Sequence, residues 1–332
     1  MTKYSVLDLS PIPAGHTAKQ SFANSVKVAQ AAERLGYTRY WLAEHHNMPG
    51  IGSAATSVLL SHVGAHTKTI RIGSGGVMLP NHAPLIIAEQ FGTLASLYGD
   101  RIDLGLGRAP GTDGITAQAL RRNLNNQVDT FPNDVLELQA YFKEAIPGQR
   151  VRAVPGAGLD IPLWILGSSL YGAQLAAHLG LPYAFASHFA PADLLPAIEI
   201  YRERFQPSEQ LQEPYVMAAM NLMAADSREE ADFIATSQMQ GVLGLVKGEP
   251  VQLPPPVKGF ADGLSSMEQA AISRFTTCLA QGTHEDVAEA VKVFEKKTGA
   301  DEIIFTAQIY DHDARIRSFE IAAETLGIFE VV

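Results

Sequence analysis

The chain contains 332 residues, of which 46% are hydrophobic and 18% charged, a composition typical of a globular protein with a large core. Its 25 basic and 35 acidic residues give a net charge of −10, and an acidic chain without a basic cluster repels nucleic acid and anionic membranes. Cys278 is the single cysteine, which excludes an internal disulfide. The sequence has neither a signal-peptide pattern nor an apolar run long enough to span a bilayer. We therefore expect a soluble cytoplasmic protein without nucleic-acid or membrane partners.

Short β-type runs alternate with helical patterns along almost the whole chain. In the first half, β-type runs at 4–9, 39–43, 70–75 and 102–106 are each followed by a helical pattern, at 21–35, 54–66, 83–97 and 133–143. The third helix illustrates the evidence, because Ile87, Phe91 and Leu94 recur at the spacing of one helical face. Segments rich in proline and glycine, such as residues 10–15, separate the elements.

The same alternation resumes after Pro155. Strands are predicted at 162–166, 183–187, 215–223 and 302–305, and helices at 171–179, 193–205, around 287–294 and at 315–326. Eight β-type runs joined mostly by helices indicate parallel strands, and eight such units close naturally into a barrel. We predict an α/β fold, a single (β/α)8 TIM barrel domain over residues 1–332. A doubly wound sheet is the rival architecture, but no glycine-rich dinucleotide fingerprint follows the first strand.

Residues 226–282 interrupt the alternation of strands and helices. A helix is expected to begin near residues 227–230, and three prolines follow at 254–256. We interpret the segment as an insertion after strand seven, serving as a lid or as a partner surface. A long irregular segment in a compact domain is usually either functional or disordered, and the sequence does not choose between the two.

In a barrel, chemistry gathers where the strands end at the C-terminal face. After the second strand, Glu44 is followed by His45 and His46, which offers an acid and two groups that titrate near neutral pH. The same residues also fit a polar loop whose histidines bond to the backbone. His45 and His46 are less suited to bind a metal ion together, because adjacent side chains on an extended chain diverge. Three convergent ligands would have to come from other parts of the chain. We expect no metal site.

The next three strand ends carry individually weak signals. Gly75 and Gly76 allow a flat ligand to approach the main chain, or simply form a tight turn. Arg108 stands among small residues and can clamp an anion, or pair with a carboxylate. Ser168 and Ser169 precede a helix, where they form a phosphate site or an ordinary N-cap. Together, the four strand ends describe one pocket with an anion clamp, a flat platform and a basic group.

These strand-end segments resemble the luciferase-like flavin oxidoreductases, from about residue 4 to residue 325. The anchors are WLAEHH at 41–46, GSGGVMLPNHAP at 73–84, GLGRAPG at 105–111, the stretch from LGSS to GLPYAFASHF at 166–189, and DEI at 301–303. Each motif alone is unspecific, whereas their combination in this order is specific. The resemblance is greatest to the small single-chain bacterial luciferase-like monooxygenases.

The resemblance implies a cofactor site for flavin mononucleotide (FMN). Gly75 and Gly76 match the site of a non-proline cis peptide against which the isoalloxazine ring rests. Arg108 matches the arginine that binds the phosphate, and Ser168 and Ser169 match the phosphate-binding turn.

The resemblance also implies an activity, that of a monooxygenase which uses dioxygen and FMN reduced by a separate flavin reductase to oxidise a small organic substrate. His45 matches the histidine assigned to acid/base work beside the flavin, and we predict His45 and the adjacent Glu44 as the catalytic residues. Luminescent members carry a cysteine where this chain has Gly107, so the resemblance gives no support for light emission. A homodimer is implied as well, with the helix at 54–66 and its neighbours as the candidate surface.

Three other functions fit the same residues. A deazaflavin can replace FMN in a hydride-transferring dehydrogenase on a related barrel. The chain can also bind flavin without catalysis, because a platform and a phosphate clamp do not require turnover. A metal-dependent hydrolase rests on the histidines alone.

Overall fold

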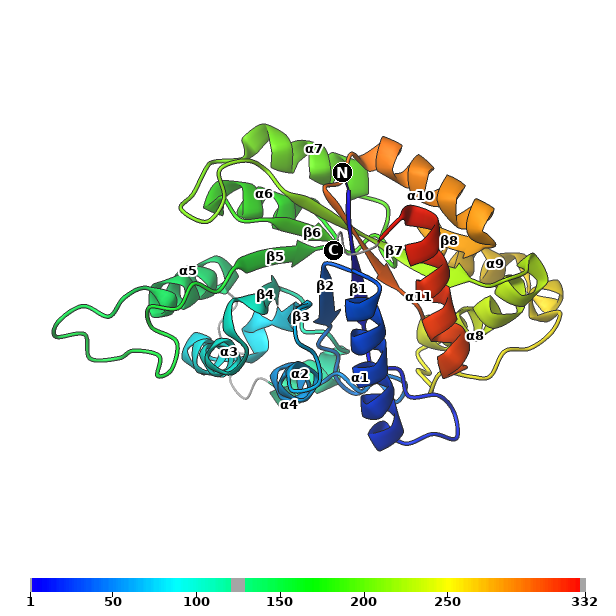
Figure 1. Ribbon diagram of the computed structural model, residues 1–332, viewed down its shortest axis with the longest axis horizontal. Helices are drawn as coiled ribbons and strands as arrows, with labels where there is room; N and C mark the ends of the chain where they lie inside the picture. Colours follow the sequence, from blue (N-terminus) through cyan, green and yellow to red (C-terminus); the bar gives the residue numbers. More distant parts are fainter. Residues whose placement is uncertain (1, 121–128, 329–332) are drawn as a thin grey trace.

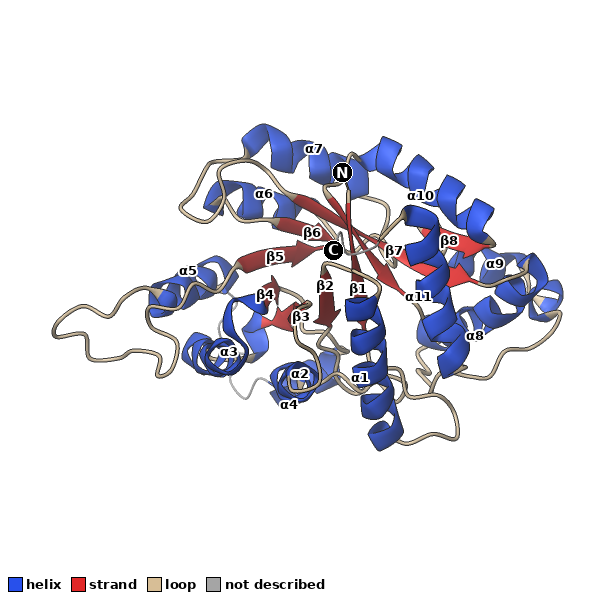
Figure 2. Cartoon of the chain, viewed as in Figure 1, coloured by secondary structure: helices blue, strands red, loops and turns tan. Residues whose placement is uncertain are grey.

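The computed structural model describes residues 2–120 and 129–328, and within these residues parallel strands form a closed barrel surrounded by helices (Figures 1 and 2). The strands are β1 (Lys3–Asp8), β2 (Arg39–Leu42), β3 (Arg71–Met78), β4 (Ile102–Gly107), β5 (Leu163–Gly167), β6 (Tyr183–Phe185), β7 (Val216–Ala224), β8 (Leu279–Gly282) and β9 (Glu302–Thr306). The helices are α1 (Ala18–Arg34), α2 (Thr56–Gly64), α3 (Pro84–Tyr98), α4 (Gly114–Leu120), α5 (Phe131–Phe142), α6 (Leu170–Leu179), α7 (Leu194–Arg204), α8 (Arg228–Val246), α9 (Ser266–Phe275), α10 (His284–Thr298) and α11 (His312–Leu326).

The barrel closes because its first strand pairs with its last. Strands β1 to β7 pair in chain order, β7 pairs with β9, and β9 pairs in parallel with β1. The predicted (β/α)8 TIM barrel is therefore confirmed. Strand β3 continues through Gly75 and Gly76 to Met78. These glycines therefore lie within the strand, whereas the sequence placed them at its end.

The insertion at 226–282 contains α8, α9 and an additional strand, β8. Ser227 caps α8 by accepting a hydrogen bond from the backbone N–H of Glu230 at 3.2 Å, which confirms the predicted helix start. Strand β8 pairs in parallel with the C-terminal end of β7, from Asn221 to Ala224. It is not one of the eight strands that close the barrel. This additional strand is not predicted from the sequence.

The insertion also contacts the loop that follows the first strand of the barrel. The N–H of Ala14 donates to the carbonyl of Leu253 at 2.8 Å, and the N–H of Leu253 donates to the carbonyl of Ile12 at 3.1 Å. The loop after α8 is therefore tied to the loop between β1 and α1, on the same face as the strand ends. No helix among the described residues is long and apolar enough to cross a membrane.

The interior of the barrel is filled in two layers. The upper layer is apolar and contains Leu7, Trp41, Ala43, Trp164, Ala184, Met217, Ala219 and Ile304. These residues recur at every second position of their strands, as expected for side chains that point into a barrel. The indole rings of Trp41 and Trp164 pack edge to face, with centroids 5.1 Å apart.

The lower layer is ionic and fully buried. Arg39 donates to Glu302 at 2.8 Å and to Asp103 at 2.8 Å, and its guanidinium lies 4.8 Å from the centroid of the Trp164 ring. Because these side chains close the N-terminal end of the barrel, a ligand can approach the interior only from the C-terminal end of the strands.

A second buried ion pair joins the first strand to the last helix on the outside of the barrel. Asp8 of β1 accepts a hydrogen bond from Arg315 of α11 at 2.8 Å and another from Ser25 of α1 at 2.7 Å, and the hydroxyl of Tyr40 donates to it as well. Burial raises the pKa of Asp8, but Arg315 and the hydroxyl donors outweigh it and hold the pKa below its usual value.

Candidate functional site

The structure brings the predicted site residues to one end of the barrel. Glu44 and His45 directly follow β2, Gly75 and Gly76 lie in the upper half of β3, and Arg108 directly follows β4. Ser168 and Ser169 form the turn between β5 and α6. These strands are neighbours in the barrel, so the residues share a continuous sector of its C-terminal face.

Glu44 is buried and accepts hydrogen bonds from three segments of the chain. Nε2 of His46 lies 2.7 Å from Oε1, Nε2 of His82 lies 3.0 Å from both oxygens, and the N–H of Met78 donates to Oε2 at 2.8 Å. The amide of Asn81 adds a longer bond of 3.3 Å. Burial raises the pKa of Glu44, but the bonds from His82, His46 and Met78 outweigh it and lower the pKa, so the group is a carboxylate at neutral pH.

His45 and His188 form a pair of partly buried imidazoles at the mouth of the barrel. Nδ1 of each ring is buried without a hydrogen-bond partner. Burial lowers the pKa of His45, and burial together with the nearby His45 lowers the pKa of His188 to about 3. Both rings are therefore neutral at physiological pH, and each offers an unused nitrogen at the strand ends.

Gly75 and Gly76 leave the upper part of β3 without side chains. The peptide bond between them is cis, as the resemblance implied, and the Gly76 carbonyl accepts a hydrogen bond from the N–H of Glu44 at 3.1 Å. A Cβ atom added to Gly76 would lie 2.8 Å from the carbonyl oxygen of Gly105 on β4, closer than such atoms approach. The backbones of β3 and β4 thus lie close together and present main chain where other strands present side chains.

Arg108 lies over the start of α6. Its guanidinium is 4.0 Å from the centroid of the Tyr171 ring, which suits a cation–π contact, and Nη1 donates to Asp129 at 3.1 Å. The ion pair with a carboxylate, one of the alternatives that the sequence left open, is therefore present. The guanidinium is half exposed, so it remains accessible to an anion.

Ser169 is the N-cap residue of α6, but its side chain makes no capping hydrogen bond. The ordinary capping role that the sequence left open is therefore not observed. The hydroxyl stands at the N-terminus of a helix of ten residues, next to the ring on which Arg108 stacks, where free backbone N–H groups and the helix dipole favour an anion.

Several residues of this face escaped the sequence analysis. His82 and Asn81 contact Glu44, and Tyr171 supports Arg108. His188 lies within a motif that carries the resemblance, and its place directly after the strand predicted at 183–187 is the available signal. Single polar residues after a strand are too common to be singled out without the structure.

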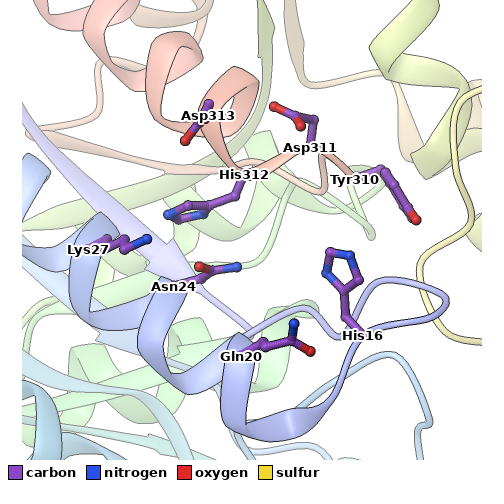
Figure 3. Close-up of a pocket in the computed structure, with 8 residues that line it drawn as sticks. All are labelled: His16, Gln20, Asn24, Lys27, Tyr310, Asp311, His312 and Asp313. Atoms are coloured by element: carbon purple, nitrogen blue, oxygen red, sulfur yellow. The ribbon is translucent and has the colours of Figure 1, made fainter.

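A cavity of about 370 Å³ lies outside this site, between α1 and α11 (Figure 3). Its walls include His16, Lys27, Tyr310 and His312, and the His312 ring points toward Lys27. None of the predicted site residues lines it. The described residues hold no cluster of His, Cys, Asp and Glu that is suited to a metal ion, at this cavity or elsewhere.

Comparison with known proteins identifies the class of this barrel. The profile of the family described as luciferase-like monooxygenase matches residues 2–302. A luciferase-like monooxygenase from Escherichia coli (strain K12) is 52% identical over 321 residues, which cover 97% of this chain and 96% of the relative. The chain therefore belongs to the luciferase-like monooxygenase family, and the resemblance seen in its motifs is confirmed.

A relative with a named reaction lies further away. An N-acetyl-S-alkylcysteine monooxygenase from Bacillus subtilis (strain 168) is 33% identical over 297 residues, 87% of each chain. Among solved structures, apo-MsnO8 superposes with a TM-score of 0.87 at 31% identity and covers 99% of both chains.

Two more distant structures share the fold. The oxygenating constituent of 3,6-diketocamphane monooxygenase from Pseudomonas putida, a type II Baeyer–Villiger monooxygenase in complex with FMN, has a TM-score of 0.70 at 17% identity and covers 99% of both chains. An F420-dependent secondary alcohol dehydrogenase in complex with an F420–acetone adduct has a TM-score of 0.70 at 14% identity and covers 98% of both chains. At these identities, the likeness concerns the barrel alone.

Proposed function

We propose that the chain is a flavin-dependent monooxygenase that uses reduced FMN and dioxygen to oxidise a small organic substrate. The observation that carries the proposal is the common location of three features: the main-chain platform at Gly75 and Gly76, the neutral His45 beside it, and the accessible Arg108. A flavin needs a flat support, a proton-handling group near its ring and a cation for its phosphate, and these residues supply all three.

The residues of the site fit FMN well. Arg108, stacked on Tyr171, and the turn at Ser168 and Ser169 would hold the phosphate, since a guanidinium and a helix N-terminus both favour an anion. The exposed main chain at Gly75 and Gly76 would support the ring. The buried Nδ1 of His45 has no hydrogen-bond partner and is a polar group that a ligand at this end of the barrel can satisfy.

Reduced FMN supplies the electrons with which one oxygen atom of dioxygen enters the substrate while the other leaves as water. His45 holds or moves a proton at Nδ1, because its lowered pKa keeps the ring neutral and able to accept one. Glu44 positions the loop that carries His45, through its bonds to His46, His82 and Met78. The apolar layer around Trp41 and the loop at Leu253 exclude water from this end of the barrel.

The test is an anaerobic titration of the purified protein with FMN, once oxidised and once reduced. Tighter binding of the reduced form is the expected result, because it fits a monooxygenase that receives FMN from a separate reductase. Absence of binding of either form would overturn the FMN assignment. A His45→Ala variant that binds FMN normally but has lost turnover supports the role of His45, whereas undiminished turnover removes His45 from the mechanism.

A deazaflavin-dependent dehydrogenase is the second candidate, favoured by the shared fold of the F420-dependent alcohol dehydrogenase. The same titration with a deazaflavin distinguishes the two. Binding of the deazaflavin in preference to FMN, without oxygen uptake, supports the dehydrogenase. Binding of FMN without turnover of any substrate supports a flavin-binding protein instead.

We also propose a flavin reductase and a second copy of this chain as partners, working in the cytoplasm. The proposed dimer surface is formed by α2 and α3, where large apolar side chains lie exposed. Val58 on α2 is 70% exposed, and Leu97 and Ile86 on α3 are 60% and 46% exposed. Apolar side chains gathered on neighbouring helices in this way are typical of a protein interface.

A further inference from the structure

Four polar side chains at the mouth of the barrel have a buried hydrogen-bonding atom without a partner. They are Nδ1 of His45, Nδ1 of His188, Oγ1 of Thr306 and Nε2 of Gln308, and we call these four residues the polar arc. Buried polar groups are satisfied in more than nine cases of ten, so four at one end of a barrel require an explanation. Each unsatisfied group costs free energy that a bound ligand can recover.

The ends of β9 and β2 bring three residues of the polar arc to the mouth of the barrel. Ile304 belongs to the apolar layer inside the barrel, and Thr306, the last residue of β9, shares its face because side chains on one face of a strand recur at every second position. Gln308 follows two residues after the end of β9, and His45 follows three residues after the end of β2, directly beyond Ala43 of the apolar layer and Glu44.

His188 completes the polar arc from the far side of the barrel. It follows β6 in a turn, and its carbonyl accepts a hydrogen bond from the amide of Asn221 on β7 at 2.7 Å. Its ring interacts electrostatically with His45. The polar arc therefore spans the ends of β2, β6 and β9, apart from the sector of Arg108, Ser168 and Ser169.

The charges around the polar arc disfavour an ionic ligand. The titratable groups that shift the pKa of His45 are Glu44 and His46, and the pKa of His188 is shifted by His45; no lysine or arginine of the described residues is among these groups. A carboxylate bound here would lose its water without gaining a cation and would stand near Glu44. An ammonium group could donate to the imidazole nitrogens, but it would bury its charge without a free carboxylate, because Glu44 is already bonded to His46, His82 and Met78, and it would leave the amide donor of Gln308 without an acceptor.

We infer that the polar arc binds a neutral amide group of the substrate. An amide oxygen accepts hydrogen bonds from the Gln308 amide and the Thr306 hydroxyl, while an amide N–H donates to an unprotonated imidazole nitrogen of His45 or His188. This inference rests on the proposed function, since it names the chemical class of the molecule that is oxidised beside the flavin.

Calorimetric titration of the protein, with FMN present, against hexanamide, hexanoate and hexylamine at neutral pH tests the inference. These probes share one alkyl chain and differ only in the polar group. Hexanamide is expected to bind at least about tenfold more tightly than either charged probe, because only the amide satisfies the polar arc without burying a charge. Equal or tighter binding of hexanoate or hexylamine, or no heat from hexanamide at millimolar concentration, would overturn the inference.

Variants locate the binding to the polar arc. Gln308→Leu and Thr306→Val are each expected to weaken hexanamide binding about tenfold, the loss of one buried hydrogen bond. Thr325→Val is the matched control, because Oγ1 of Thr325 is also buried without a partner but lies on α11, outside the polar arc. Equal weakening by Thr325→Val would show that the effect is not local and would contradict the inference.

The two proposals fail separately. If FMN binds but the charged probes are preferred, the amide inference fails and the flavin assignment stands. If hexanamide is preferred but FMN does not bind in its own titration, the flavin assignment fails, whereas the inference that the polar arc binds a neutral amide stands.

Discussion

Nε2 of His82 lies 3.0 Å from both carboxylate oxygens of Glu44. This contact ties the residues after β2 to the helical turn at Leu79–Asn81 after β3, and therefore fixes the loop of His45 relative to the glycine platform. The remaining lone pairs of Glu44 are occupied by His46, Met78 and Asn81, so the carboxylate serves as a structural anion.

Replacement of Glu44 by glutamine tests this role. Glu44→Gln keeps the shape of the side chain but places an amide N–H₂ group among groups that all donate hydrogen bonds. We expect the free energy of unfolding to fall by about 1.5–3 kcal/mol, measured by urea denaturation near neutral pH. Glu324→Gln is the control, since Glu324 is exposed on α11 and contacts His284 and Arg317 at the surface. An equal loss in both variants would contradict a special role for Glu44.

The stability of the protein is expected to decrease in mild acid because of His188. Its pKa is about 3 in the folded protein, against a usual value of 6.5, so the unfolded chain binds the proton first. The contribution of the neutral ring to the free energy of unfolding is fully present above pH 6.5 and is lost as the pH falls toward 3. The free energy of unfolding falls by at most about 1.4 kcal/mol per pH unit over this range. Unfolding of wild type and His188→Gln, compared over this range, should show a shallower slope in the variant. His178→Gln, in an exposed residue of α6, should keep the slope of the wild type.

Arg108→Ala is expected to weaken the binding of FMN but not that of riboflavin. The guanidinium faces the proposed phosphate site, so FMN affinity should fall about tenfold to a hundredfold, the value of a charge-assisted hydrogen bond. Riboflavin lacks the phosphate and should bind equally well to both proteins, as measured by flavin fluorescence. Arg228→Ala, in an exposed arginine of α8 paired with Asp286, controls for the loss of a positive charge. Equal weakening for both flavins would mean that Arg108 acts on the ring and not on the phosphate.

Gly76→Ala is expected to disturb the close approach of β3 and β4. The added methyl group meets the carbonyl oxygen of Gly105, a backbone atom that cannot move aside cheaply. We expect a loss of about 1–3 kcal/mol in unfolding free energy, together with weaker FMN binding. Gly241→Ala, in the middle of α8 with nothing within 4 Å of the added atom, should instead be neutral or stabilising by about 0.5–1 kcal/mol. A harmless Gly76→Ala variant with normal FMN binding would argue against the platform.

The proposed dimer is tested at Val58. Val58→Glu places a charge on the exposed apolar face of α2 and should convert the dimer to a monomer in analytical ultracentrifugation. Val293→Glu introduces the same charge at a 54% exposed valine of α10 and should leave the mass unchanged. A wild-type protein that sediments as a monomer would rule the dimer out directly.

The barrel was predictable because its strands are short apolar runs between clear breakers and helical faces. The pairing of β8 was not, since four residues, Leu279–Gly282, have too weak a pattern to be recognised and their partner at the end of β7 is remote in sequence. The extent of β3 was also underestimated, because Gly75 and Gly76 were interpreted as the end of a strand that continues to Met78.

The candidate site was predictable where it rests on clustered motifs. Glu44, His45 and Arg108 stand directly after strands, so the barrel prediction alone brought them to one face. His188 is a single polar residue after β6, and Thr306 and Gln308 are isolated polar residues at the end of β9. Only the positions of the strands and the missing hydrogen-bond partners reveal that they belong together.

The ion pair between Asp8 and Arg315 has a consequence for the synthesis of the chain. Its two partners are 307 residues apart, which at about 5–20 residues per second corresponds to on the order of 15–60 s of translation. Strand β1 lacks both β9, its partner in the sheet, and the guanidinium that neutralises Asp8 until residues 302–315 have been synthesised. The barrel therefore closes only after these residues have been made, and the nascent chain has to be protected from aggregation until then.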